Sequence, residues 1–593
     1  MQLRARTYTL FDLLRIPFRT APLPMTYLAA SMLARSAVPS LQVLAVAAFI
    51  DTALAVAGGR AALPAVYAPA LAVAALVGFS WIPDQLNRLA ISRAELKLYA
   101  GLRSAFIAKR ARMMYRHIEN PETWDLISRV SDKPEQKIGE GVNDLFGLAS
   151  TLLTVGGLLA ILFARVWWAA IAIIGISVPL LALSARAGRA GYDAEKETAR
   201  MKRGTRYLAT VLKDRENVEE RSLFGYTDHM DERWHAEYER ARKIELRVNA
   251  RWFVRMKGSG ILVALLSVAV AGVLLAPVVN GRLSLGLYFA IVNAVFGLVQ
   301  SISWNLVNQT KQLSKSREYL RDLTTFAALE ETPDALELPG PPPAFRSLEF
   351  RDVTFAYPGT ERRILDGLSF SAEAGRHYAL VGVNGAGKTT VTKLLTGLYP
   401  EYGGEILLDG RELRTYTEPE RKAYFSVVFQ DFARYGVPLH DNIAVGGAHR
   451  TGEERLREVL HDAGLEGTER RLPQGWDTPL GKIRTDGQDL SGGEWQRVAM
   501  ARAMAGPAPV RILDEPTASL DPISESRIYE EYGRMSAGRT TFFISHRLGS
   551  ATLADEILVI DAGRLAERGS HAELMERGGL YAEMFESQRS WYQ

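Results

Sequence analysis

The stretch GVNGAGKTT at 382–390 decides the fold of the C-terminal part of this chain. It fits the pattern Gly-x4-Gly-Lys-Thr and follows a short apolar run at 377–381. This order predicts a buried strand, a glycine-rich turn and then a helix. The glycines let backbone amides close on a β-phosphate, and the positive end of the helix dipole adds to the attraction. Lys388 is expected to reach the β- and γ-phosphates, and Thr389 to offer its hydroxyl to Mg²⁺.

A second apolar run, VRILDE at 510–515, ends in two acidic residues. Asp514 at the end of this strand would lie beside the phosphates, where a carboxylate can orient Mg²⁺ and its waters. Glu515 follows directly and can polarise a water for attack on a γ-phosphate. Together with the phosphate-binding loop, the two acids predict a site that hydrolyses a nucleoside triphosphate.

Between these two strands stands LSGGEWQR at 490–497, and here the chain resembles the nucleotide-binding domain of ATP-binding cassette (ABC) proteins. That family has an aromatic residue, a phosphate-binding loop, a glutamine, an LSGGQ-type signature, an Asp-Glu pair and a histidine, in this order. The chain departs from the commonest signature at Glu494, a change that we expect to be tolerated. The matching positions are Tyr357, 382–389, Gln430, 490–494, Asp514–Glu515 and His546, and ASLD at 518–521 is similar to the family's D-loop.

The resemblance implies a role for each matching residue. Tyr357 would stack on adenine, Gln430 would ligate Mg²⁺ and sense the γ-phosphate, and His546 would hold the attacking water. Catalysis is thereby assigned to Glu515, His546 and Lys388, and Mg²⁺ binding to Thr389, Gln430 and Asp514. ATP binding is assigned to Tyr357, Gly382, Asn384, Gly385, Gly387, Lys388, Thr389, Thr390, Gln430, Ser491, Gly492, Gly493 and Asp521.

The signature residues Ser491, Gly492 and Gly493 precede a helix, whose N-terminal amides can bind phosphate. In the family they contact ATP held by the opposite ATPase domain, so two domains bury two nucleotides. This chain has a single ATPase module and is therefore expected to pair. Both half-sites look intact, including Glu515, whereas a heterodimer often has one degenerate site. We therefore expect a homodimer.

The N-terminal half contains long apolar stretches that predict membrane-spanning helices. About 20 apolar residues are needed to cross ~30 Å of hydrocarbon, and the stretches at 145–163 and 261–279 meet this without a charge. Lys and Arg in the N-terminus and in the two long intervening loops predict that these segments lie in the cytoplasm. Six spans are expected, near 22–56, 61–82, 142–164, 166–186, 258–279 and 283–309.

This arrangement resembles the membrane domain of ABC exporters, in which each long loop ends in a short coupling helix that touches the ATPase. The candidates are PETWDLISR at 121–129 and EERSLFGY at 219–226, and a solvated turn between two long helices is the alternative. Apolar residues spaced over 10–18 predict an amphipathic helix on the membrane surface, with a flexible tail as the alternative.

A proline-rich stretch, ETPDALELPGPPPA at 331–344, marks a domain boundary, because proline cannot extend a helix or a sheet. Beyond it, period-two alternation at 348–359 predicts an antiparallel strand. We therefore expect a multidomain chain: a six-helix α-helical transmembrane domain at 1–330, a linker at 331–346 and an α/β P-loop ATPase domain of ABC type at 347–593.

Composition narrows the functional classes. The net charge of +4 over 593 residues gives no overall field that would favour a nucleic-acid partner. The chain has no cysteine, which excludes disulfides, cysteine-zinc sites and a thiol nucleophile. The apolar spans make the lipid bilayer a partner and exclude a soluble ABC ATPase that acts on DNA or ribosomes. A multi-pass protein of a bacterial inner (cytoplasmic) membrane is expected.

The resemblance implies ATP-driven export of a still unknown substrate by alternating access. A lipid flippase or a multidrug exporter with the same engine is the alternative, and an ATP-gated channel is disfavoured because the hydrolytic residues are intact. FQDFARYGVPLHDNIAVG at 429–446 is similar to bacterial exporters of ribosomally made peptides, which makes a peptide the first candidate cargo. Without cysteine, the chain cannot trim a leader by a cysteine peptidase.

Polar residues in the last span suggest a substrate cavity. Asn293, Gln300, Trp304 and Asn308 fall on one face at 3.6 residues per turn. Such a stripe suits either a wet cavity or hydrogen bonds between helices, and the sequence does not separate these alternatives. Arg35 and Asp84 also interrupt apolar stretches.

Overall fold

The computed structural model describes residues 3–214, 217–281, 283–447, 451–514, 538–545 and 548–590, and for part of the membrane helices only the backbone. The chain forms two compact units. Unit 1 contains residues 1–109 and 125–329, and unit 2 contains residues 110–124 and 330–593. A short piece of the N-terminal half thus belongs to the C-terminal unit.

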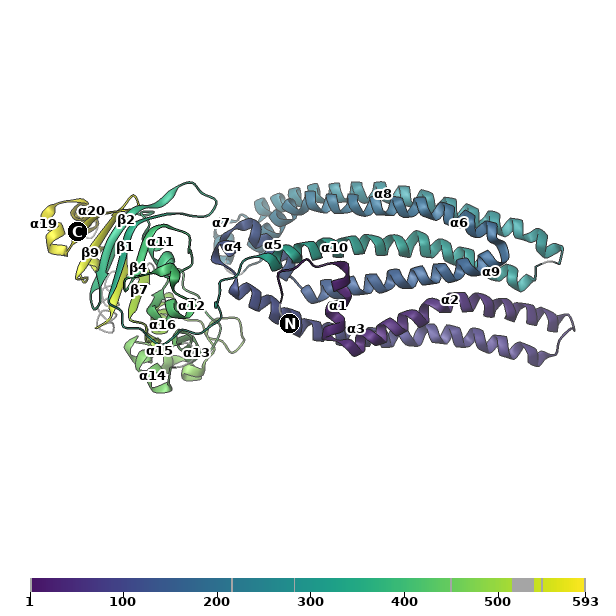
Figure 1. Cartoon of the computed structure of the whole chain (residues 1–593), viewed down its shortest axis with the longest axis horizontal. Coiled ribbons are helices and arrows are strands. Elements are labelled where there is room, and N and C mark those ends of the chain that lie inside the picture. The colour runs from purple at the N-terminus through teal and green to yellow at the C-terminus, as the bar shows by residue number, and fades with distance from the viewer. Residues whose placement is uncertain are drawn as a thin grey trace. The chain divides into compact units, whose positions relative to one another are not determined.

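Unit 1 is built from long helices joined by short turns (Figure 1). Its elements, some of which continue into unit 2, are α1 (Leu10–Thr20), α2 (Pro22–Ala57), η1 (Leu63–Val66), α3 (Tyr67–Arg112), α5 (Pro121–Ser131), α6 (Pro134–Lys213), α7 (Val218–Phe224), α8 (Thr227–Val279), α9 (Leu285–Gln300), the π-helix η3 (Ser301–Leu306) and α10 (Val307–Ala328).

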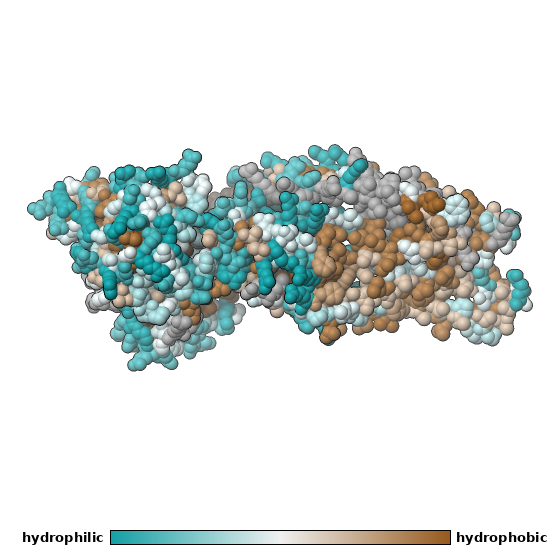
Figure 2. Space-filling model, viewed as in Figure 1, coloured by the Kyte–Doolittle hydropathy of each residue, from teal (hydrophilic) through white to brown (hydrophobic). Residues whose placement is uncertain are grey.

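Several of these helices are long and apolar enough to cross a membrane. Among the described residues, three stretches meet both criteria, Pro22–Ala57, Leu63–Arg112 and Pro134–Ala164, and shorter apolar helices cover Val268–Val279 and Leu285–Leu298. Figure 2 shows hydrophobic residues over much of the visible face of unit 1, whereas hydrophilic residues cover most of unit 2. The predicted helical membrane domain is confirmed.

Helix α6 contains a reversal of direction, although its 80 residues form a single element. Gly147 lies against Gln309, and Gly191 lies against Lys311, two residues further along α10. In a straight helix, residues 147 and 191 would be roughly 66 Å apart at 1.5 Å per residue. The element must therefore fold back between them, as the ribbon in Figure 1 does. This agrees with the short connection that the sequence predicts near residue 165.

The last membrane segment is not a regular α-helix. The π-helix at Ser301–Leu306 separates α9 from α10, and a π-turn adds a residue to the α-helical repeat. Spacing at 3.6 residues per turn therefore does not relate Asn293 on α9 to Asn308 on α10. Both side chains are exposed, while those of Gln300 and Trp304 lie outside the described part. The cavity stripe stays a prediction, and the periodicity on which it rests is wrong.

Residues 10–20 form the predicted amphipathic helix, α1. Leu13 and Ile16 are buried, while the Phe11 side chain is 70% exposed. Asp12 closes a capping box with Thr9 and forms an ion pair with Arg6. The alternative of a flexible tail is therefore wrong for this stretch, and its position on a membrane surface stays a prediction.

The described residues of unit 2 form two sheets. The antiparallel sheet has the order β2-β1-β4-β5, and the other has the order β10-β9-β3-β8-β7-β6, with β3, β6, β7, β8 and β9 parallel. The antiparallel strand predicted at 348–359 is confirmed as β1, which pairs with β2 and β4. The strands are β1 (Ser347–Ala356), β2 (Arg363–Glu373), β3 (His377–Val381), β4 (Gly403–Leu408), β5 (Arg411–Glu412), β6 (Phe425–Val428), β7 (Val510–Asp514), β8 (Thr540–Ile544), β9 (Glu556–Asp561) and β10 (Arg564–Gly569).

Helices complete unit 2. A core of buried side chains joins α11 to β1, β2, β3 and β4, and a second core lies around α16. The helices are α4 (Tyr115–Glu119), α11 (Lys388–Leu395), η4 (Leu413–Thr415), α12 (Glu418–Tyr424), α13 (Leu439–Ala444), η5 (Val445–Gly447), α14 (Glu453–Asp462), α15 (Glu466–Arg471), η6 (Gly475–Asp477), α16 (Gly492–Ala505), α18 (Leu548–Ala551), α19 (His571–Arg577) and α20 (Leu580–Ser590).

The proline-rich linker is attached to unit 2 along its length. The Lys422 ammonium on α12 donates to the carbonyls of Ala335 and Glu337, at 2.6 and 3.0 Å. Gly340 N donates to Pro419 O at 3.0 Å. These bonds give the linker a defined path, although prolines prevent it from joining a sheet.

Candidate nucleotide-binding site

The stretch 382–390 forms the predicted strand, turn and helix. β3 ends at Val381, and α11 begins at Lys388. Lys388 is buried, and its ammonium donates to Gly382 O at 2.8 Å and to Val383 O at 3.3 Å. These bonds turn the charge back over the loop, where a bound phosphate would meet it.

Two positions of this loop accept only glycine. Gly382 has φ 154°, and a Cβ there would lie 2.1 Å from Ile560 O. Gly387 has φ 106°, and a Cβ there would lie 2.6 Å from a methyl group of Leu365. The Ile560 oxygen belongs to the backbone and the Leu365 methyl group to a packed strand, so moving either aside would cost free energy. The positive φ at Gly387 is also one that other residues rarely adopt. This tight loop, with glycine at both close approaches, fits a phosphate group held by backbone amides.

The predicted Mg²⁺ ligands of α11 and β7 meet in the structure. The Thr389 hydroxyl donates to Asp514 Oδ1 at 3.1 Å, and Asp514 is 1% exposed at the end of β7. Parallel strands β3, β8 and β7 end at the same edge of the sheet, which brings the two residues together. A hydroxyl and a carboxylate are oxygen ligands of the kind that Mg²⁺ takes, so the pair fits this ion.

Tyr357 and Gln430 come from different strands. Tyr357 follows β1, and its hydroxyl shares a hydrogen bond of 3.0 Å with Thr390 on α11. Gln430 is exposed two residues after β6, whose Val428 pairs with Leu513 beside Asp514. The site therefore gathers residues from three strand ends and the phosphate-binding loop.

The signature residues begin helix α16. Ser491 is its N-cap, and Glu494 closes a capping box by accepting from Ser491 N at 2.9 Å and from Ser491 Oγ at 2.8 Å. The other carboxylate oxygen of Glu494 accepts from Thr468 at 2.9 Å and from Arg471. Burial alone would raise the pKa of Glu494, but the bonds from Ser491 and Thr468 and the charge of Arg471 outweigh it and lower the pKa.

Three predicted site residues, Glu515, Asp521 and His546, lie outside the described residues. Asn384 and Gly385 are exposed on the loop, and Gly492 and Gly493 are the first residues of α16. The structure thus brings together the phosphate-binding loop, Thr389, Thr390, Asp514 and Tyr357, and places the signature on a separate helix.

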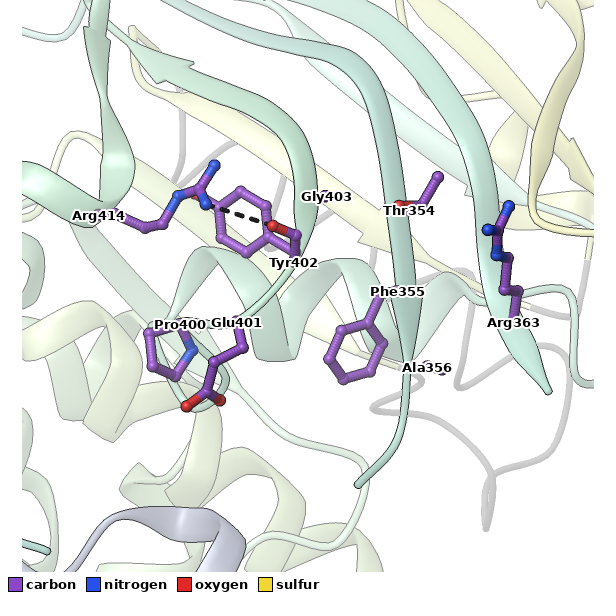
Figure 3. Close-up of a pocket in the computed structure, with 9 residues that line it drawn as sticks. All are labelled: Thr354, Phe355, Ala356, Arg363, Pro400, Glu401, Tyr402, Gly403 and Arg414. Carbon is purple, nitrogen blue, oxygen red and sulfur yellow. Dashed lines mark hydrogen bonds between the residues drawn. The ribbon is translucent and has the colours of Figure 1, made fainter. Parts of the chain in front are cut away.

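A hollow of about 570 Å³ lies beside this site (Figure 3). It adjoins Tyr357 through the end of β1, and no residue of 382–390 lines it. In Figure 3, Arg414 and Arg363 stand at opposite sides of the rings of Tyr402 and Phe355. Both guanidinium groups are already bonded, to Glu412 and Asp366 respectively. We assign no ligand to this hollow.

The first candidate coupling segment, 121–129, stays a prediction; its first residues, 121–124, belong to unit 2 and the others to unit 1. Residues 121–129 lie in α5, which begins after Asn120 caps the amides of Glu122 and Thr123. The segment that packs within unit 2 is 110–124, with α4 at its centre. An Asn-Pro pair at a helix start was the sequence signal for this boundary.

Segment 110–124 is fixed to both the linker and the ATPase fold. Met113 forms a β-bridge with Glu331. Arg116 forms ion pairs with Glu330, the residue before the linker, and with Glu401, which precedes β4. The Tyr115 ring packs edge-on against Tyr399, with centroids 5.5 Å apart. Sequence reasoning missed these contacts because they join residues distant in the chain.

The second candidate coupling segment does form a helix. α7 covers Val218–Phe224 and ends at Gly225, which has φ 59°. Leu223 and Phe224 at its end are 77% and 68% exposed. Two exposed apolar side chains suit a contact surface, but contact with an ATPase unit stays a prediction.

Comparisons with known proteins define the class of this chain. The family model described as ABC transporter matches residues 365–518. A solved structure described as a bacterial Atm1-family ABC exporter with ATP bound superimposes with a TM-score of 0.78 at 25% identity, covering 95% of this chain and 98% of that chain.

Curated relatives span both parts of the chain. The subtilin transport ATP-binding protein SpaT of Bacillus subtilis is 27% identical over 514 residues, covering 86% of this chain and 83% of that protein. The ATP-dependent lipid A-core flippase of Shewanella frigidimarina (strain NCIMB 400) is 29% identical over 536 residues, covering 88% and 86%. That of Haemophilus influenzae (strain 86-028NP) is 36% identical over 332 residues, covering 56% of each chain.

The fold, the phosphate-binding site and these likenesses define an ABC transporter: a helical membrane domain fused to an ATPase domain. Among ABC transporters, the chain is an exporter-type half-transporter, which hydrolyses ATP to drive export. The class and the activity predicted from the sequence are confirmed.

Proposed function

We propose that the chain works as a homodimer in the cytoplasmic membrane of a bacterium and exports a peptide. The observation that supports the ATPase part most directly is the meeting of Thr389 and Asp514 beside a loop that requires glycine at positions 382 and 387. Ser491 and Gly492 are exposed at the start of α16. Their position on the surface supports a contact with ATP that a second copy of the chain holds.

Each residue of the site has a proposed role. Thr389, Asp514 and Gln430 hold Mg²⁺, which neutralises charge on the phosphates. Lys388 binds the β- and γ-phosphates. Glu515 acts as general base on the attacking water, with His546 holding that water. The remaining proposed ATP contacts are Tyr357, Gly382, Asn384, Gly385, Gly387, Thr390, Ser491, Gly492, Gly493 and Asp521.

Alternating access follows from this arrangement. Closure of two ATPase units on ATP would draw the loops of both membrane domains together, and hydrolysis would release them. Two segments are suited to pass on this movement: residues 110–124, which already belong to unit 2, and α7.

A peptide is the first candidate cargo. The similarity to the subtilin transport protein extends over 86% of this chain, and residues 429–446 gave the same indication from the sequence. The second candidate is a lipid, which the similarity to lipid A-core flippases supports. An exporter of drug-like molecules and an ATP-gated channel remain lesser alternatives.

The cargo proposal is tested by ATPase stimulation of the purified protein in lipid nanodiscs, against a panel of peptides, lipids and drugs. A peptide exporter should be stimulated by peptides with saturable dependence, at fixed lipid composition. Stimulation by a lipid alone would favour the flippase, and stimulation by drugs alone would remove the peptide proposal.

The proposed base is tested by Glu515→Gln. The amide cannot accept a proton from water, so ATP should still bind while turnover falls by roughly 10²–10⁴-fold. The variant should also accumulate as a closed dimer with trapped ATP. Turnover close to that of the unchanged protein would remove Glu515 from this role, whereas loss of ATP binding would indicate a structural defect.

A further inference from the structure

Lys393 on α11 lies in a cage of three tyrosine rings. It follows Thr390 by one helical turn, so both side chains lie on one face of the helix. The ammonium nitrogen lies over the Tyr357 ring at 5.0 Å from the centroid, over Tyr115 at 5.8 Å and over Tyr399 at 5.9 Å. Glu119 adds a carboxylate 3.6 Å from it. These distances are in the range of cation–π attraction.

The cage joins segments that are far apart in the sequence. Tyr115 and Glu119 lie on α4, between α3 and α5. Tyr357 follows β1, and Tyr399 follows α11 and is 1% exposed. The rings also pack against one another edge-on, with Tyr399 5.5 Å from both Tyr357 and Tyr115. A shift of any one ring therefore changes the surroundings of the lysine.

Lys393 remains charged in this cage. Its side chain is 21% exposed. Burial alone would lower the pKa of Lys393, but the Tyr357, Tyr115 and Glu119 side chains outweigh this effect and raise the pKa. The ammonium is therefore protonated at neutral pH and attracts the rings throughout the physiological range.

The Tyr357 ring is held at two points. Its hydroxyl bonds to Thr390, and the ring lies under the Lys393 ammonium. A cation over one face of an aromatic ring draws electron density toward itself, because the ring face is negative. The opposite face then becomes a better stacking partner for an electron-rich base. The arrangement would both orient the ring and strengthen its stacking.

We propose that Lys393 is a positioning residue for ATP: it prepares the Tyr357 ring for adenine and links that ring to the loop segment α4 through Tyr115 and Glu119. The proposal rests on the proposed stacking of adenine on Tyr357. Lys393 touches neither the phosphates nor the Mg²⁺ ligands. Through Lys393, the loop between α3 and α5 can respond to the base of the nucleotide.

The first test compares ATP with a ligand that has no base. Lys393→Met removes the charge and keeps the length of the side chain. In the full-length protein in nanodiscs, it should raise the KM for ATP roughly two- to tenfold, with a smaller effect on kcat. The inhibition constant of inorganic tripolyphosphate, a competitor without adenine, should stay unchanged. Lys393→Arg, which restores a cation, should recover most of the ATP affinity.

A general disturbance of α11 would behave differently. It would weaken the binding of ATP and the binding of tripolyphosphate by the same factor. That outcome, or an unchanged KM for ATP, would overturn the proposal. Lys422→Met is the matched control, because this lysine binds linker carbonyls in the same unit. Lys422→Met should leave the ratio of the KM for ATP to the inhibition constant of tripolyphosphate unchanged.

Tyr357→Leu separates this proposal from the assignment of the adenine site. If Tyr357→Leu leaves the ratio of ATP to tripolyphosphate binding unchanged, adenine does not stack there, and both the site assignment and the role of Lys393 are wrong. If Tyr357→Leu changes the ratio but Lys393→Met does not, only the role of Lys393 is wrong.

The link to α4 is tested by a double-mutant cycle with Tyr115→Leu and Lys393→Met. Residues that act through one contact give non-additive effects, whereas independent residues add. We expect the combined change in the KM for ATP to be smaller than the product of the two single changes. Strict additivity would show that the loop is not connected to the base through Lys393.

Discussion

The charge of Lys388 is directed by the loop that precedes it. Because its ammonium already bonds to Gly382 O and Val383 O, it needs little rearrangement to meet a phosphate. Lys388→Ala should therefore lower ATP affinity about tenfold or more, the value expected when a hydrogen bond to a charged group is lost. Calorimetry on the purified protein measures this, with Lys422→Ala as control. Unchanged affinity would contradict the assignment of the phosphate-binding loop.

Glu494 stands where the family's commonest signature has glutamine, and it orders the start of α16. Loss of this capping box in Glu494→Ala should lower stability by about 0.5–2 kcal/mol and also lower ATPase activity, because Ser491 loses its anchor. The chain provides a matched control: Glu573 closes the same capping box with Ser570 on α19. Glu573→Ala should cost similar stability in thermal melting and leave the ATPase rate unchanged.

The pKa of Glu494 gives this prediction a pH dependence. A carboxylate whose pKa is lowered in the folded state stabilises that state above its ordinary pKa of ~4.3 and loses this contribution as the pH falls through the lowered value. Glu494 should therefore contribute fully at neutral pH. If the stability difference between Glu494→Ala and the unchanged protein vanished already at pH 6, the ionised carboxylate with its bonds from Ser491 and Thr468 would not be the cause.

Helices α2 and α9 lie close together at Gly286. A Cβ there would lie 2.3 Å from Ala47 O, and the amide of Gly286 donates to Asp51 Oδ1 at 2.8 Å. Ser284, the N-cap of α9, donates to the other oxygen of Asp51 at 2.6 Å. Gly286→Ala should therefore separate the helices and lower the melting temperature of the protein.

A second glycine supplies the control for this contact. Gly272 on α8 has nothing within 4 Å of a built Cβ. Gly272→Ala should be neutral or stabilising, because alanine favours a helix over glycine by roughly 0.5–1 kcal/mol. Equal effects of the two substitutions would show that α2 and α9 do not pack at Gly286.

At the level of elements, the sequence predicts those that local chemistry specifies. The phosphate-binding loop needs glycine, lysine and threonine in fixed places, so the sequence pattern alone predicts it at 382–390. The alternation of apolar and polar residues at period two predicted β1. By contrast, α4 has only five residues and no periodic pattern, so no pattern in the sequence predicts it. The π-helix at Ser301–Leu306 leaves no periodic signal in the sequence SISWNL, so a regular 3.6-residue repeat was extended across it.

The orientation of the whole chain follows from the charges of its loops. The N-terminus, the two long loops and the ATPase unit should share the cytoplasmic side, and the turn after α8 should face outward. Since the chain has no cysteine, a single introduced cysteine can be labelled without background. Asn280 is exposed with φ −81°, which makes it a better position than Gly281 at φ 67°.

In intact cells, Asn280→Cys should react with a membrane-impermeant maleimide. Glu454→Cys, exposed on α14 of the ATPase unit, should react only after the cells are opened. The reverse pattern would overturn the orientation, and labelling of both in intact cells would show that the reagent enters.

The ATPase site as a whole was largely predictable, because its residues are defined by type and order along the chain. Thr389 and Asp514 meet because β3, which leads into the loop before Thr389, and β7, which ends at Asp514, end at one edge of the sheet. This rule for parallel sheets can be applied without coordinates. The cage around Lys393 was not predictable. Its members come from positions 115, 357, 393 and 399, and their proximity depends on tertiary packing between α4 and the rest of unit 2.

The position of residues 110–124 in unit 2 has a practical consequence for preparing the ATPase domain by itself. A fragment that starts at Glu330 would contain every nucleotide-binding motif, but it would lack the partners of Tyr399, Lys393 and Glu401 on α4. Such a fragment would expose an aromatic surface to water and hold Tyr357 less firmly. Its measured ATP affinity would therefore understate that of the intact transporter, and a graft of 110–124 would be needed to restore it.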